Sequence, residues 1–134
     1  MFTELRNGNS LKLKSLRLLW ALTFVVAGLS HFFFYREFSE AIPEVIPQKI
    51  FLNVVVGITE VVLGLLSLTT WSRFSYWGTF FLLIIYIWSH VYFINHGCCV
   101  AGFCVPRWIA WLRLVLVHPL LLYTNYYLIR NDGD

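Results

Sequence analysis

Six polar or ionisable side chains interrupt otherwise apolar stretches of this 134-residue chain: His31, Asn53, Glu60, His90, Arg113 and His118. A charged side chain in the middle of a hydrocarbon layer costs roughly 2.5–3.5 kcal/mol, so each needs a partner or a function. Histidine, glutamate and arginine can exchange protons, form ion pairs or donate hydrogen bonds to a ligand. These six residues are therefore the candidate ligand-binding residues, and none is assigned a catalytic role.

Helix geometry predicts that the six residues share two depths. A helix rises about 1.5 Å per residue, so all but Glu60 and His118 would lie roughly 5–8 Å below one surface. Glu60 and His118 would lie about 15 Å deep, close to the middle of a bilayer. The pattern predicts one polar pocket that opens at or near that surface.

Glu60 is the sharpest of these signals. It continues a stripe of Asn53, Gly57 and Gly64 at helical spacing, and the glycines would allow a neighbouring helix to approach closely. Arg113 would lie about 7 Å higher than Glu60, within the combined reach of two long side chains. We therefore predict a buried ion pair between them. Such a pair could bind a ligand or a proton, or it could only fix the packing of the helices.

Three cysteines, Cys98, Cys99 and Cys104, lie in the segment before Pro106. In an oxidising compartment, Cys104 could form a disulfide with Cys98 or Cys99 and leave one odd thiol. A structural staple, three free thiols and an electron-transfer role are all compatible with this spacing. Zinc bound by His96 and the cysteines is a weaker alternative, because the spacing matches no standard zinc motif, so no metal is expected.

The histidines also bear on cofactors. His31 and His90 would lie at similar depth on different helices, as a bis-histidine haem requires, but two histidines are a weak signal and haem is not expected. Histidine and arginine donors near aromatic rings suit the carbonyl oxygens and ring of a quinone, which is the preferred candidate ligand.

Four apolar segments must position these residues: about Arg17 to Tyr35, Ile50 to Thr70, Tyr76 to Asn95, and Trp108 to Ile129. Hydrophobic residues make up 59% of the chain and charged residues only 13%. About 20 residues of helix cross a hydrocarbon core of about 30 Å. We therefore expect one domain, residues 1–134, that is an all-α, four-helix transmembrane bundle. The net charge of +3 gives no indication of nucleic acid binding.

The basic residues predict an orientation. Six of them, from Arg6 to Arg17 together with Arg73 and Arg130, fall on one side, and Arg36, Lys49 and Arg107 fall on the other. Positive charge is retained inside, so we expect both termini in the cytoplasm and a multi-pass protein of the plasma or inner membrane. The first apolar segment exceeds a signal-peptide core and lacks a clear cleavage site, so no cleavage is expected.

Short motifs in these segments resemble the DoxX-like family of small membrane proteins. They are Ala27 to Phe32, Ile42-Pro43 with Ile46-Pro47, Gly57 to Glu60, and Trp111 to Leu114, which is similar to the Trp-x-Arg-Leu signature of that family. The resemblance covers residues 16–129. It implies a four-helix bundle with His31, Glu60 and Arg113 in shared positions, and for some relatives a link to quinone-dependent sulfur oxidation or oxidative-stress complexes.

Two functions from different classes follow. The first is an accessory subunit of a membrane redox system, associated with a membrane redox complex or a second copy of itself. The second is a scaffold or assembly factor without catalytic activity, whose polar residues only hold the bundle together. A transporter is disfavoured, because the sequence has no internal repeat and no pair of broken helices.

Overall fold

The computed structural model describes residues 2–132, with side chains described from Ser10 onward. The chain is almost entirely helical in this range. Its elements, in order, are α1 (Phe2–Phe33), α2 (Tyr35–Glu40), α3 (Lys49–Leu66), α4 (Ser72–Asn95), β1 (Cys99–Val100), β2 (Phe103–Cys104), α5 (Arg107–Leu112), a π-helical turn (Arg113–Val117) and α6 (His118–Asn131).

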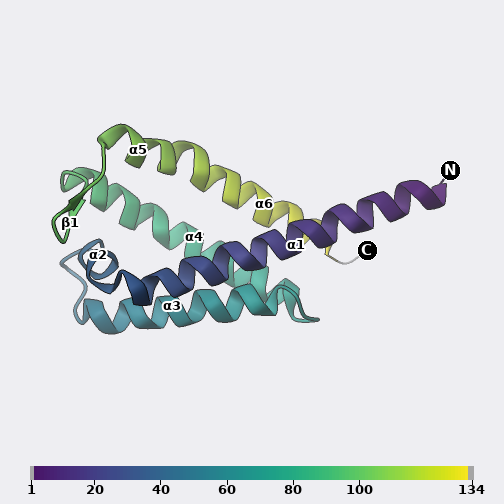
Figure 1. The fold of residues 1–134 in the computed structure, drawn as a ribbon, viewed down its shortest axis with the longest axis horizontal. Coiled ribbons are helices and arrows are strands. Elements are labelled where there is room, and N and C mark those ends of the chain that lie inside the picture. The colour runs from purple at the N-terminus through teal and green to yellow at the C-terminus, as the bar shows by residue number, and fades with distance from the viewer. Residues whose placement is uncertain (1, 133–134) are drawn as a thin grey trace.

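The long helices run side by side and alternate in direction (Figure 1). The start of α1, the end of α6 and the α3–α4 connection lie at one end of the bundle, which we call the terminal end. The α2 helix and the β1–β2 hairpin lie at the other, which we call the hairpin end. Four helical segments are long and apolar enough to cross a membrane: Ser10–Phe33, Lys49–Leu66, Ser72–Asn95 and Arg107–Asn131. The four predicted helical segments are thus confirmed as helices.

Helices α1 and α3 pack with their backbones in close contact. A Cβ added to Gly28 of α1 would lie 2.6 Å from the carbonyl oxygen of Gly57 on α3, and one added to Gly57 would lie 2.8 Å from Cβ of His31. Farther along α3, a Cβ on Gly64 would lie 3.0 Å from the carbonyl oxygen of Ala21. Glycine is needed here for space, as the stripe predicted.

The interior and exterior of the bundle have reversed polarity. Asn53, Glu60 and Asn125 are at most 3% exposed. Large apolar side chains such as Phe81 and Val115 point outward and are more than 60% exposed. A smaller apolar core of Trp20, Phe24, Tyr76, Leu83 and Leu128 lies toward the terminal end.

Four local features differ from the sequence-based expectation. Asn7 to Ser10 was expected to precede the first helix, but α1 begins at Phe2 and its first turns extend beyond the other helices (Figure 1). The leucines, lysines and arginine of residues 11–19 favour helix, so the helix need not stop at the edge of the apolar segment. In the first connection, residues 35–40 form the additional helix α2.

The third connection contains a hairpin that was not predicted. Ala101 and Gly102 have φ angles of +49° and +82°, which fit the two-residue turn preferred between twisted antiparallel strands. The fourth apolar segment also departs from a regular α-helix at Arg113–Val117. Pro119 follows this turn, and proline lacks an N–H and clashes with the carbonyl of the residue four positions earlier, so a wider turn relieves the conflict.

The first test concerns the α1–α3 contact. Replacing Gly57 with leucine should reduce the free energy of unfolding by about 3 kcal/mol, because neither backbone can move aside without losing its packing. Thermal or denaturant unfolding in detergent micelles measures the change. Val62→Leu, at an exposed position of the same helix, is the matched control and should have little effect. Equal stability of the two variants would contradict the close contact.

Candidate functional site

His31, in the last turn of α1, is held by Asn53 of α3. The Asn53 Nδ2 donates to the backbone carbonyl of His31 at 2.9 Å, which turns Oδ1 of Asn53 toward the imidazole. Nδ1 of His31 lies 2.6 Å from this oxygen. Because an amide oxygen can only accept, Nδ1 must carry a hydrogen. The Asn53 side chain therefore fixes both the ring orientation and its tautomer.

The other ring nitrogen of His31 faces Glu60. Its Nε2 lies 3.3 Å from Oε2 of Glu60, an ion-pair distance without hydrogen-bond geometry. The second carboxylate oxygen of Glu60 accepts a 2.6 Å hydrogen bond from the Tyr86 hydroxyl of α4. We call His31, Asn53, Glu60 and Tyr86 the His31 cluster; it joins α1, α3 and α4.

Phe38 of α2 covers the His31 ring, with 4.2 Å between ring centroids. Both ring nitrogens of His31 already face protein oxygens, so neither is directed at a metal or a haem. His31 as a whole residue is 9% exposed, and Glu60 is 3% exposed. The His31 cluster is thus a closed group whose polar atoms mostly satisfy one another.

His90 and His118 form a second, separate contact between α4 and α6. Their ring centroids lie 5.3 Å apart in an edge-to-face arrangement. His118 is buried and its Nε2 donates a 2.6 Å hydrogen bond to the carbonyl of Leu83. The six predicted residues therefore do not line one common pocket: three belong to the His31 cluster and two to this histidine pair.

Arg113 is close enough to His90 and Glu60 for its charge to act on both, but it joins neither group by a hydrogen bond or an ion pair. Its side chain is exposed at the start of the π-helical turn, and it makes no ion pair within residues 10–132. The predicted ion pair between Glu60 and Arg113 is therefore wrong. The close approach of α1 to α3 brings His31 to Glu60 instead. The π-helical turn also changes the angular relation between Arg113 and His118 that a regular helix would give.

Sequence reasoning missed an ion pair at the terminal end. Arg17 of α1 lies 3.2 Å from Asp132, just after α6, and donates to the carbonyl of Ser67 at 3.1 Å. The Ser72 hydroxyl at the start of α4 donates to the same carboxylate. Arg17 was counted as one of the charges at the cytoplasmic end. Its position among apolar residues was the only sequence signal of a buried contact.

The three cysteines form one disulfide and leave one free thiol. Cys99 and Cys104 are bonded across the hairpin, and Cys98 is a free thiol that is 1% exposed. Of the pairings left open by the sequence, Cys104 therefore joins Cys99. A zinc site built from His96 and three thiolates is incompatible with this bond, and the described residues contain no group of three metal-binding side chains.

A hollow of about 280 Å³ lies beside the disulfide. Cys99, His96 and Lys49 line it together with the acidic residues Glu40 and Glu44. Nδ1 of His96 donates to the carbonyl of Tyr92 at 2.9 Å, which leaves Nε2 without a hydrogen-bond partner among the described residues. Glu40 accepts a hydrogen bond from the Ala101 N–H and so ties α2 to the hairpin. The disulfide thus borders a polar, accessible site.

Comparison with known proteins yields one family. Residues 20–127 match the family described as Domain of unknown function (DUF8561). No curated protein and no solved structure matches the chain.

The second test distinguishes the partner of Glu60. A double-mutant cycle with Glu60→Gln and His31→Ala should give a coupling energy of about 2 kcal/mol, because the side chains are in direct contact. The parallel cycle of Glu60→Gln with Arg113→Leu should couple by less than about 0.5 kcal/mol. Unfolding of the single and double variants in micelles supplies both values. A larger coupling to Arg113 than to His31 would refute the assignment.

Proposed function

The chain belongs to this family of unknown function, and we propose that it is a four-span integral membrane protein that serves as an accessory to a membrane redox system. Its exchangeable group would be the Cys99–Cys104 disulfide. The observation that carries the proposal is the exposure of both bonded cysteines beside the polar hollow at the hairpin end.

The reversed polarity of the bundle supports membrane integration. Large apolar side chains surround the four long helices, whereas the buried residues include Asn53, Glu60 and Asn125. In water, such an exterior would leave extensive apolar surface unprotected. In a bilayer it would contact lipid, and the interior hydrogen bonds would hold the helices together.

The basic residues support an orientation with the hairpin outside. Six are near the terminal end and three near the hairpin end, which favours cytoplasmic termini. The disulfide would then face the plasma-membrane exterior or the periplasm. Such compartments allow disulfides to persist, so charge and cysteine chemistry agree.

Thiol–disulfide exchange supplies a balanced redox step. A thiolate of a partner dithiol would attack one sulfur of the Cys99–Cys104 bond and release the other as a thiolate. The second partner thiol would then break the mixed disulfide. The partner becomes a disulfide, and the two cysteines gain two electrons and two protons. His96 is placed to donate a proton to the departing thiolate.

A quinone would restore the disulfide by accepting the same two electrons and two protons. Both ring nitrogens of His31 already contact Asn53 and Glu60, so His31 is left out of the proposed quinone site. The residues that remain as donors to a quinone are His90 and Arg113. Arg113 follows α5, about 9 Å of helix beyond the hairpin connection. Its exposed guanidinium can donate to a quinone carbonyl, and the bilayer would supply the quinone. The resemblance to the DoxX-like family is compatible with this proposal.

The closed His31 cluster favours the scaffold as the second candidate. Its polar atoms bind one another and join three helices, as a packing lock would. A scaffold would need no exchange at Cys99 and Cys104. The disulfide would then serve only to hold the hairpin.

The orientation is tested by thiol labelling in intact cells. In a Cys98→Ser variant, a membrane-impermeant maleimide should label Cys99 or Cys104 after mild reduction, without permeabilisation. A cysteine-free variant carrying Thr69→Cys, at the exposed terminal end, should react only after permeabilisation. The opposite pattern would reverse the orientation.

The redox proposal is tested by reoxidation in nanodiscs. Protein reduced at Cys99 and Cys104 should regain its disulfide when a fully substituted benzoquinone such as ubiquinone-1 is added under anaerobic conditions. Arg113→Leu and His90→Ala should slow this about tenfold, as expected for the loss of one hydrogen bond to a charged or polar donor. Cys98→Ser is the control and should react at the wild-type rate. Equal rates in all variants, or no reoxidation, would refute the redox proposal and leave the scaffold as the remaining candidate function.

A further inference from the structure

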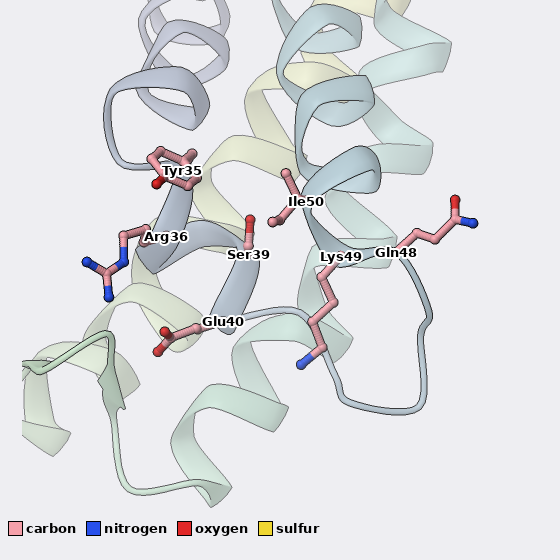
Figure 2. A pocket seen from close by; sticks show the side chains of 7 residues that line it. All are labelled: Tyr35, Arg36, Ser39, Glu40, Gln48, Lys49 and Ile50. Carbon is pink, nitrogen blue, oxygen red and sulfur yellow. The ribbon is translucent and has the colours of Figure 1, made fainter.

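A second and larger hollow, of about 580 Å³, opens between α2 and the start of α3 (Figure 2). We call it the α2–α3 hollow. It is distinct from the hollow beside the disulfide, although Glu40 and Lys49 border both. It is lined on one side by α2 and on the other by the first residues of α3, and it plays no part in the redox proposal.

The first turn of α3, which borders this hollow, has unpaired N–H groups. The earliest helical bond of α3 runs from the N–H of Leu52 to the carbonyl of Gln48. Lys49, Ile50 and Phe51 precede it, so their N–H groups have no partner within the helix. Gln48 does not cap them with its side chain. The start of this 18-residue helix therefore presents donors and the positive end of the helix dipole.

Ser39 provides an independent indication of a ligand. It is only 6% exposed, and its hydroxyl makes no hydrogen bond. In Figure 2 the hydroxyl points from α2 across the hollow toward Ile50 at the start of α3. Buried hydroxyl groups nearly always have a partner, so an acceptor is expected in this space.

The surrounding charge favours an anion. Arg36 of α2 and Lys49 of α3 both line the hollow. In Figure 2 their charged ends point outward from it, Arg36 away from α3 and Lys49 away from Ser39. The acidic group beside them, Glu40, already accepts the hydrogen bond from Ala101. Two flexible cations, a buried hydroxyl and a helix N-terminus together form the donor set that a phosphate group requires.

Apolar residues border the same hollow. Tyr35 is 49% exposed and Ile50 61%, and the neighbouring Phe34 and Phe51 are 56% and 66% exposed. These side chains continue onto the outward faces of the long helices, where acyl chains would lie. Donors for a phosphate group beside exposed apolar side chains are the features expected of a site for an amphiphilic lipid.

We propose that the α2–α3 hollow binds the phosphodiester headgroup of an anionic phospholipid. The phosphate would lie over the start of α3, hydrogen-bonded to the Ser39 hydroxyl and flanked by Arg36 and Lys49. The acyl chains would follow Ile50 and Phe51. This inference rests on the proposed membrane location but not on the disulfide chemistry.

Native mass spectrometry of protein released from nanodiscs tests the site. In an equimolar mixture of phosphatidylglycerol and phosphatidylcholine, the wild-type chain should retain phosphatidylglycerol preferentially. Ser39→Ala and Lys49→Gln should each reduce that preference about tenfold, because each removes one donor to the phosphate. Arg73→Gln removes an exposed cation at the terminal end and should leave the preference unchanged.

Unchanged selectivity in Ser39→Ala and Lys49→Gln would overturn the lipid site. So would equally tight binding of water-soluble glycerol phosphate, which would identify a site for soluble phosphates. An alkaline wash of proteoliposomes separates these outcomes from failure of the membrane proposal. Protein that stays in the bilayer without lipid preference refutes the lipid site alone, whereas protein that is washed off refutes membrane integration.

Discussion

The backbones of α1 and α3 meet at Gly28 and Gly57, and the rest of the polar interior depends on this contact. Any side chain larger than hydrogen at these positions would separate the helices. The contact brings His31 of α1 within 3.3 Å of Glu60 on α3 and allows Asn53 to reach both the ring and the backbone of His31. A buried carboxylate would otherwise need another cation. Gly28 and Gly57 thus determine which residue becomes the partner of Glu60, because they allow α1 to approach α3.

Two polar groups tie the helices at different levels of the bundle. The His31 cluster joins α1, α3 and α4, and at the terminal end Arg17 joins α1 to the residues that follow α3 and α6. Helix association in lipid cannot rely on apolar burial, because lipid tails are as apolar as leucine, so close packing and hydrogen bonds must supply the specificity. Between these levels, Asn125 of α6 donates to Thr79 of α4 at 2.7 Å. The long helices are therefore held in register along their length.

The sequence predicted the four long helices because length and hydropathy determine them locally. It also predicted the close approach at the glycines, since this follows from residue type and spacing. It left open whether the cysteines are oxidised, because spacing alone is compatible with a disulfide and with free thiols. The partner of Glu60 could not be predicted in this way. Depth and reach alone favoured Arg113, whereas the observed partner depends on interhelical distance and on the π-helical turn near Pro119. Arg17 was misread for a similar reason, because its partner Asp132 lies at the opposite end of the chain.

The two hollows shift attention from the middle of the bundle to the hairpin end. In the His31 cluster nearly every polar atom already has a protein partner, so a ligand would have to displace existing contacts. At the hairpin end the opposite holds: the Ser39 hydroxyl lacks a partner, the first turn of α3 is uncapped, and an exposed disulfide borders a hollow. Binding is favoured where desolvated donors gain a partner without losing one. The buried polar residues are thus best understood as the framework that positions α2, α3 and the hairpin. In both proposals, ligands would bind at the end of the bundle that they support.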